Sequence, residues 1–235
     1  MARLLALLAI VAAAGCGGSS FSGLKLASVC GAGTAASPRW LETGDGLRLY
    51  AATEGQGDTT VVLAHESGAQ GLCGWLPTMR FLAANGIRAL AFDFRGVAPS
   101  AIPPARTQFD WWRDLQAAVD AAHAKRVVLM GASMGGAIAV ADAYRIRGID
   151  AVVSLSGELS LPASHVDALA GRERLRAPLL VVASTRDGYL LPVDARRLKP
   201  TRLLVFPGYR HGWEIVDELP RARQLVLDWI RRPRR

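Results

Sequence analysis

Short apolar runs alternate with amphipathic segments along most of the chain. The runs are VVLAH (61–65), IRALAFDF (87–94), RVVLMG (126–131), AVVSLSG (151–157), PLLVVAS (178–184) and TRLLVF (201–206). The amphipathic segments have helical spacing and lie near residues 72–85, 111–123, 134–147, 164–175, 193–199 and 214–231. Continuous apolar runs are typical of strands buried on both faces. Their alternation with helices predicts an α/β fold with a mostly parallel central sheet and helices on both faces.

The segment ahead of these runs predicts an antiparallel hairpin. Thr43-Gly44-Asp45-Gly46 separates two short alternating runs, which is a turn signal between strands. We therefore expect the ordered part to start near Trp40. With 235 residues and 51% apolar content, the chain can bury one full core. We assign residues 38–235 to a single domain.

The first sixteen residues, MARLLALLAIVAAAGC, have the form of an export signal. An early arginine precedes an eleven-residue apolar run from Leu4 to Ala14, which is too short to span a bilayer. The end of this segment resembles a bacterial lipobox, in which Cys16 becomes lipidated and forms the mature N-terminus. This resemblance implies a signal peptide over residues 1–15 and a membrane-anchored lipoprotein facing the periplasm or the cell exterior. Ordinary cleavage nearby and a retained anchor are the alternatives, and all three imply export.

The segment from Gly17 to Ser37 is rich in Gly, Ala and Ser and has no helical or strand periodicity. It predicts a flexible spacer, so residues 16–37 form the lipidated cysteine and its tether. If Cys16 carries lipid, Cys30 and Cys73 are left in an oxidising compartment, which favours a disulfide between them over two free thiols. None of the three has zinc-ligand spacing, and no histidine cluster accompanies them. The sequence therefore predicts no metal site.

The charge distribution indicates little about the function. The net charge is +8, but the basic residues are scattered, apart from the tail Arg231–Arg235 (RRPRR). No basic helix and no alternation of basic and aromatic residues indicates nucleic-acid binding. The tail is typical of a solvated chain end, with a weak attraction to anionic membranes as the alternative.

Ser133 is the first candidate for chemistry. It stands between the apolar run 126–131 and a helical segment, among Gly131, Ala132, Gly135 and Gly136. A hydroxyl is unfavourable in a buried strand, and so many glycines are unfavourable in a stable helix. A sharp strand-to-helix turn that holds out a nucleophilic serine explains both features, since larger neighbours would clash. The alternative is a glycine-rich loop without function.

A nucleophilic serine needs a base. His211, in PGYRHGWE, follows the last predicted strand and precedes the last helix, where it can fold back over Ser133. His65 ends the first parallel strand and is expected to be structural. His123 lies at a helix end, and His165 lies in a polar connection.

The base needs an acid to orient it. Asp187 follows the strand PLLVVAS directly, in STRDGYLLP. Its alternative role is that of a turn aspartate before glycine. Glu158, after the preceding strand, is the competing candidate. We expect Asp187 to be the acid.

The order Ser133, Asp187, His211, each after a strand, resembles that of the α/β-hydrolase family. The resemblance runs from about Trp40 to Arg231 and includes G-A-S-M-G (131–135). It also includes LAFDFRGVAPS (90–100), similar to the family's D-x-R-G-x-G-x-S segment, and the D-G-Y-L-L-P and R-H-G segments. It implies a serine hydrolase, with carboxylic esters as the expected substrates and no cofactor.

Two backbone amides are expected to hold the oxyanion. Met134 follows the nucleophile at the start of a helix, where free amides favour negative charge. The family takes its second amide from the loop after the first parallel strand, which here assigns it to Ser67 in HESGAQGLCGW. Glu66 stands where the family usually has glycine. Its carboxylate either points to solvent or disfavours the developing charge.

The implied mechanism is acyl transfer through Ser133. His211 takes the serine proton during attack on the carbonyl, and then activates water to release the acid. Only about twenty residues separate the strands between which larger members insert a cap, so we expect little or no lid and a preference for short or surface-presented esters. A hydroxyl acceptor in place of water would give an acyltransferase. A non-catalytic binding protein on the same fold is the third reading, supported by Glu66.

Overall fold

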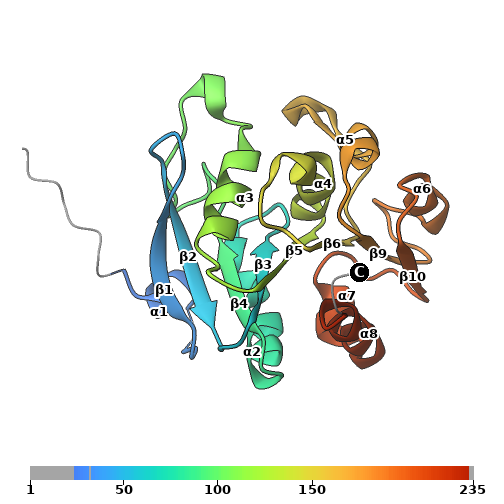
Figure 1. Cartoon of the computed structure of the whole chain (residues 1–235), viewed down its shortest axis with the longest axis horizontal. Helices are drawn as coiled ribbons and strands as arrows, with labels where there is room; N and C mark the ends of the chain where they lie inside the picture. The colour runs from blue at the N-terminus through green and yellow to red at the C-terminus, as the bar shows by residue number, and fades with distance from the viewer. Residues whose placement is uncertain (1–23, 32, 233–235) are drawn as a thin grey trace, which may run out of the picture.

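An eight-stranded mixed sheet forms the centre of the protein (Figure 1). The computed structural model describes residues 24–31 and 33–232. The strand order is β1-β2-β4-β3-β5-β6-β9-β10. The strands are β1 (Ser37–Glu42), β2 (Arg48–Glu54), β3 (Thr59–Ala64), β4 (Arg88–Phe92), β5 (Arg126–Ala132), β6 (Ala151–Leu155), β9 (Leu179–Ser184) and β10 (Arg202–Phe206).

Six of these strands run parallel, and the first two do not. β4, β3, β5, β6, β9 and β10 pair in parallel, whereas β1 pairs antiparallel with β2 and β2 pairs antiparallel with β4. The β1–β2 turn lies at Thr43-Gly44-Asp45-Gly46, and Thr43 Oγ1 donates to Asp45 Oδ1 at 2.6 Å. The predicted fold class is confirmed, including the hairpin and all six apolar strands.

Helices cover both faces of the sheet. One core contains side chains of α3 (Trp111–Asp120), α4 (Met134–Asp142), α5 (Ala168–Arg174) and α6 (Pro192–Arg197). The other contains side chains of α1 (Leu26–Cys30), the 3-10 helix η1 (Gly71–Trp75), α2 (Leu76–Ala84), α7 (Glu214–Glu218) and α8 (Pro220–Ile230). Successive residues of β5 alternate between the two cores, Leu129 in the first and Met130 in the second. A strand buried on both faces therefore reads as one continuous apolar run.

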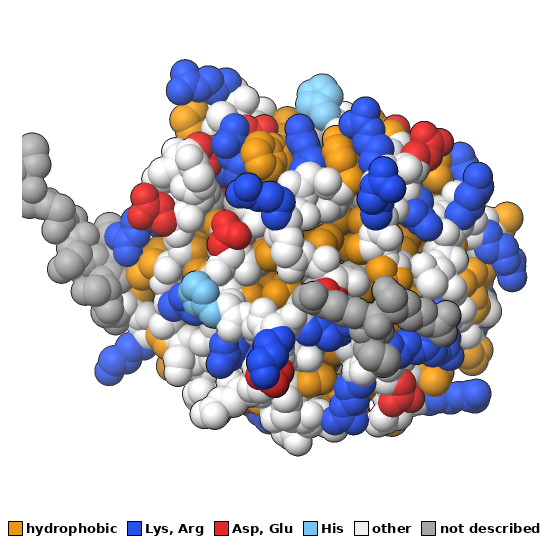
Figure 2. Space-filling view, in the orientation of Figure 1, with side chains coloured by type: hydrophobic (Ala, Val, Ile, Leu, Met, Phe, Trp, Pro, Cys, Tyr) orange, Lys and Arg blue, Asp and Glu red, His pale blue; other side chains and the backbone are white. Residues whose placement is uncertain are grey.

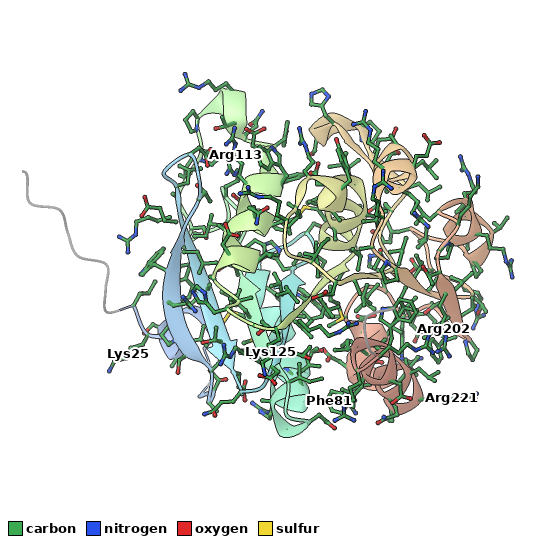
Figure 3. The ribbon with its side chains drawn as sticks, in the orientation of Figure 1. Lys25, Phe81, Arg113, Lys125, Arg202 and Arg221 are labelled. Carbon is green, nitrogen blue, oxygen red and sulfur yellow. A yellow bond between two sulfur atoms is a disulfide. The ribbon has the colours of Figure 1, made fainter. Side chains whose placement is uncertain are left out.

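The sheet extends across the molecule. Lys25, next to α1, and Arg202, at the start of β10, lie on opposite sides of the view in Figure 3. The parallel strands all end at the same edge, and the loops beyond that edge carry the residues discussed below.

Two helical expectations need correction. The last helix is interrupted because Pro220 begins α8, and a residue before proline is driven out of the helical region. Leu219 accordingly adopts φ −107° and ψ 97°. Within the segment expected to be helical over 164–175, residues 166–167 instead form β8 (Val166–Asp167), which pairs with β7 (Ser160–Leu161). The helix α5 starts only at Ala168.

Part of the segment expected to be a flexible spacer, residues 16–37, is helical. Residues 26–30 form α1, and Leu26 is buried in the second core. Cys30, at the end of α1, forms a disulfide with Cys73 of η1, with the two Cα atoms 5.4 Å apart. The ordered part therefore begins well before Trp40.

The segment between β6 and β9 is short. It contains β7, the 3-10 turn η4 (Pro162–Ser164), β8 and α5. The strands β7 and β8 have two residues each and α5 has seven, so the segment is small, in agreement with the expectation of little or no cap.

Candidate active site

Ser133 lies at a strained turn between β5 and α4. Its backbone has φ 46° and ψ −117°, a left-handed conformation that residues other than glycine rarely adopt. Its N–H donates to Leu155 O at 2.9 Å, which ties the turn to the end of β6. Such local strain is held in place by the surrounding structure and is common where a side chain must be presented in one direction.

The glycines beside Ser133 are required by space. A Cβ atom on Gly131 would overlap the backbone of Gly135, and one on Gly135 would overlap the carbonyl oxygens of Ala64 and His65. The helix α4 thus begins in direct contact with β5 and with the end of β3. These contacts agree with the expectation that side chains larger than hydrogen would clash at Gly131 and Gly135.

His211 and Asp187 are hydrogen-bonded to each other. Nδ1 of His211 lies 3.0 Å from Oδ1 and 3.2 Å from Oδ2 of Asp187. Because a carboxylate only accepts, Nδ1 carries the proton and donates it. Asp187 is buried directly after β9, and its Oδ1 also accepts from Tyr189 N–H at 2.9 Å. This leaves Nε2 of His211 as the ring nitrogen available to another group.

The pKa values of both partners are shifted toward the charged pair. Burial by itself raises the pKa of Asp187, but the hydrogen bonds that its carboxylate accepts, first among them the one from His211, outweigh burial and hold the pKa below its usual range. Burial lowers the pKa of His211, and Asp187 outweighs that effect through its hydrogen bond and its charge. The carboxylates of Glu66 and Glu158 act in the same direction. The pKa of His211 is raised above its usual range.

Glu158 lies near this pair without replacing Asp187 in it. Burial raises the pKa of Glu158, and the charges of His211 and Asp187 both act on it. Among the described residues, no hydrogen bond joins Glu158 to the His211 ring, whereas two contacts join Asp187 to it. The geometry therefore favours Asp187 as the partner of His211.

The other histidines lie elsewhere. His65 is fully buried, donates from Nδ1 to Glu66 O at 2.6 Å, and accepts at Nε2 from Phe94 N–H at 3.1 Å. Burial lowers the pKa of His65 to about 4, so its ring stays neutral as a structural link between β3 and the loop after β4. His123 and His165 are exposed.

Glu66 points inward toward the loop that carries His211. A Cβ atom on Gly212 would overlap Glu66 Oε2, so glycine at this position leaves room for the carboxylate. Oε2 is buried and has no hydrogen-bond partner among the described residues. Burial raises the pKa of Glu66, although the charge of His211 and the hydrogen bond from Trp213 N–H act against it. The solvent-facing orientation considered for Glu66 is therefore wrong.

The sequence did not predict the roles of two neighbours of His211. Gly212, with φ 54°, makes room for the Glu66 carboxylate, whereas the R-H-G segment predicted only the position of the base. Tyr189 packs its ring 4.6 Å from the His211 ring, centroid to centroid, and is largely exposed. The D-G-Y segment contained this residue, but nothing in the spacing indicated a ring contact.

The two expected oxyanion donors occupy different settings. Met134 is the first residue of α4, so its N–H has no partner within the helix. Ser67 lies in the exposed loop between β3 and η1. Cys73 of η1 ties the end of this loop to α1 through the disulfide, and Leu72 N–H donates to Asp93 Oδ1 at 2.6 Å. Both contacts hold the end of the loop that leads into η1.

The described residues contain neither a group of metal-ligating side chains nor a membrane-spanning helix. No group of His, Cys, Asp and Glu that could hold a metal ion occurs in residues 24–31 and 33–232. In the same residues, no helix has the length and apolar character needed to cross a membrane. The expected signal peptide and Cys16 lie outside the described residues. Figure 2 shows Lys and Arg side chains spread over the visible face rather than gathered in one patch.

Sequence comparison identifies the family. Residues 61–235 match the Alpha/beta hydrolase family, and the chain belongs to that family. A search of curated proteins gave no significant match.

Solved structures with the same fold include several esterases. An esterase of Pyrococcus furiosus superposes with a TM-score of 0.70 at 17% identity, covering 88% of this chain and 95% of that one. A putative aryl esterase from Burkholderia cenocepacia gives 0.68 at 18%, covering 83% and 98%. The enol-lactonase from Burkholderia xenovorans LB400 gives 0.68 at 16%, covering 83% and 100%. At these identities the likeness establishes the fold.

Proposed function

We propose that this α/β hydrolase is an exported serine esterase that cleaves carboxylic esters through Ser133, His211 and Asp187. The observation that carries the proposal is the Asp187–His211 hydrogen bond at 3.0 Å, together with a serine on a strained turn at the same edge of the sheet. Nucleophilic catalysis needs a base that is oriented by a carboxylate and a hydroxyl that this base can reach, and both kinds of group occur at this edge of the sheet.

In the first step, the ester acylates Ser133. Nε2 of His211 takes the proton of Ser133 Oγ as that oxygen bonds to the ester carbonyl carbon. Asp187 stabilises the imidazolium that forms. The carbonyl oxygen, now negative, accepts from the N–H of Met134 at the start of α4, where the helix dipole favours negative charge, and from the N–H of Ser67. Imidazolium then protonates the leaving alkoxide, giving an acyl-serine.

Hydrolysis of the acyl-serine reverses these roles. His211 removes a proton from water, the hydroxide adds to the acyl carbon, and Ser133 leaves with its proton restored. A pKa of His211 above its usual range makes the ring a stronger base once it is deprotonated. The carboxylic acid is then released.

The substrate class follows from the open surroundings of the site. The segment between β6 and β9 contains only two strands of two residues each, one 3-10 turn and one seven-residue helix, and Tyr189 is exposed beside His211. This openness supports short or surface-presented esters over long acyl chains enclosed in a tunnel. The esterase and lactonase structures with the same fold support ester and lactone carbonyls.

A panel of esters with matched variants tests the function. The wild-type protein should hydrolyse a short activated ester, and Ser133→Ala and His211→Ala should each lose several powers of ten in kcat. The double variant should be little worse than either, because the two residues act as one unit. Additive losses would contradict the proposed pair. Product analysis with an added alcohol distinguishes hydrolysis from transfer to a hydroxyl.

The proposals of export and of membrane anchoring depend on the sequence of residues 1–16 alone. We propose that residues 1–15 direct export and that lipid on Cys16 holds the protein at a membrane. Cys16→Ser should then release the protein from the membrane fraction, because firm attachment needs the acyl chains on that sulfur. Intact mass of the detergent-extracted protein is the direct measurement. A mature N-terminus at another residue, without lipid, would end this proposal.

A further inference from the structure

Ser156 follows β6 directly, beside the strand that precedes the proposed acid. Leu155, the last residue of β6, pairs with Val182 of β9, and the N–H of Ser156 donates to Val182 O at 2.9 Å. Asp187 follows β9 and folds back toward its end, where the N–H of Asp187 donates to Ser184 O at 3.4 Å. The strand register therefore places Ser156 next to the turn that holds Asp187.

The backbone of Ser156 is strained. Its φ is 52°, in the left-handed region that favours glycine. A turn of this shape would form more easily with glycine at position 156, and the side chain of Ser156 is therefore kept at a local cost. Ser133, with φ 46°, keeps its side chain at the nucleophile turn in the same way. The backbone geometry alone does not explain the hydroxyl of Ser156.

The Ser156 side chain is fully buried, with an exposed fraction of 0%. No acceptor among the described residues has good hydrogen-bond geometry with its Oγ. Native proteins rarely retain a buried hydroxyl without a partner. Burial raises the pKa of Asp187, whereas His211 and, next in size, the Ser156 hydroxyl lower it. The hydroxyl is thus close to this carboxylate, and rotation of the hydroxyl and its side chain can direct the hydrogen toward it.

The Asp187 carboxylate retains an acceptor position for this hydroxyl. Oδ1 accepts from His211 Nδ1 at 3.0 Å, from Tyr189 N–H at 2.9 Å and from Leu190 N–H at 3.4 Å. Oδ2 has a contact with His211 at 3.2 Å and no second contact of good geometry among the described residues. Asp187 is 1% exposed, so solvent has little access to it. Oδ2 can therefore accept a hydrogen bond from Ser156.

We propose that Ser156 is a positioning residue of the esterase site, whose hydroxyl donates to Oδ2 of Asp187 and holds the carboxylate toward His211. Donors on both oxygens fix the plane of the carboxylate, so that Oδ1 stays aligned with Nδ1 of His211. Asp187 is then held from two sides, by the loop after β10 and by the residue after β6. The effect on turnover rests on the proposed function, whereas the contact itself can be measured in a protein without activity.

The pKa of His211, measured by NMR titration, tests this contact directly. Ser156→Ala removes the donor, so the charge of Asp187 acts more fully on the imidazolium, and the pKa of His211 should rise by about half a pH unit. The other carboxylates that act on His211 are those of Glu66 and Glu158, and this variant leaves both in place.

Two further variants separate the hydroxyl from other effects of substitution. Ser154→Ala is the matched control, because Ser154 is equally buried on β6 and its Oγ is likewise without a partner among the described residues. It should leave the pKa of His211 unchanged. Ser156→Gly also lacks the hydroxyl and adopts φ 52° without strain. It should therefore raise the pKa of His211 as Ser156→Ala does, even if the alanine variant folds poorly.

Ester kinetics give the second readout. In Ser156→Ala, kcat should fall about threefold to thirtyfold while KM changes less than about twofold, because the hydroxyl acts through Asp187 and does not touch the substrate. A pKa of His211 that stays in place or falls in both Ser156 variants, or that rises equally in Ser154→Ala, would overturn the proposal. The expected rise in a protein that hydrolyses no ester would support the contact and reject the esterase.

Discussion

Nδ1 of His211 donates to Oδ1 of Asp187 across 3.0 Å, from the loop after β10 to the loop after β9. β9 and β10 are adjacent and parallel, so the last residues of both strands reach the same edge of the sheet. The pair is therefore positioned by the strand register, and the contacts of Asp187 with Tyr189 N–H fix the carboxylate within it.

The first prediction concerns the choice of acid. Asp187→Asn preserves shape but removes the charge that holds the His211 tautomer, so kcat should fall by roughly three to four powers of ten. Glu158→Gln should change kcat by less than about tenfold, because Glu158 does not hydrogen-bond to the ring. Steady-state kinetics on one activated ester checks both variants. The reverse pattern would assign the acid to the loop after β6.

The second prediction concerns Glu66 and the pH profile. The general base must be neutral, so kcat/KM should fall as pH drops through the raised pKa of His211. Glu66 contributes to that raised pKa, and Glu66→Gln should therefore move the acidic limb to lower pH. Glu42→Gln, exposed at the end of β1, should leave the limb in place. An unchanged limb in Glu66→Gln, or one moved to higher pH, would show that its charge does not act on the base.

The third prediction concerns stability against pH. Burial raises the pKa of Asp93 from 3.8 to about 7, and its Oδ1 accepts from Leu72 N–H. The folded state thus holds the proton more tightly than the unfolded state. The resulting stability is complete below about pH 4 and is lost as the pH rises through 7.

Asp93→Asn removes this titration while its amide oxygen still accepts from Leu72 N–H. The stability of the variant relative to wild type should rise by roughly 2–4 kcal/mol between pH 4 and pH 8. Denaturant unfolding at the two pH values measures it. Asp120→Asn, exposed on α3, serves as the control and should show the same difference at both. A pH-independent effect of Asp93→Asn would contradict the raised pKa.

The fourth prediction concerns the disulfide. Cys30 and Cys73 are 43 residues apart in sequence, so the bond closes a long loop in the unfolded chain. Replacing both by serine should cost about 2–5 kcal/mol of stability. Hydrogen exchange should increase first in α1 and in the loop of Ser67, which the bond joins. A double variant as stable as wild type under oxidising conditions would mean that the bond does not restrain these segments.

The pattern of the sequence predicted the sheet better than the site. Runs such as VVLAH and PLLVVAS identified the strands because burial on both faces requires an unbroken apolar run. The turn at Ser133 was predictable because its glycines are needed where neighbouring backbone leaves no room for a Cβ atom. The segment of α1 was missed because Leu26–Cys30 is a single helical turn, held by burial of Leu26 and by a partner 43 residues away.

The inward orientation of Glu66 shows where the sequence carried too little information. A carboxylate in a glycine-rich loop is typical of a solvated side chain. Its actual position depends on Gly212, which is 146 residues away in the chain, and on the N–H of Trp213. Contacts of this kind follow from the assembled sheet and not from local spacing.

Covalent labelling of Ser133 tests the central claim most directly. The purified protein is incubated with a fluorophosphonate, digested, and analysed by mass spectrometry, with Ser133→Ala treated in the same way. The claim that Ser133 is a nucleophile activated by His211 predicts one adduct per chain on Ser133, none on Ser133→Ala, and strongly slowed labelling in His211→Ala. An unlabelled wild-type protein, or an adduct at another residue that persists in Ser133→Ala, would contradict it.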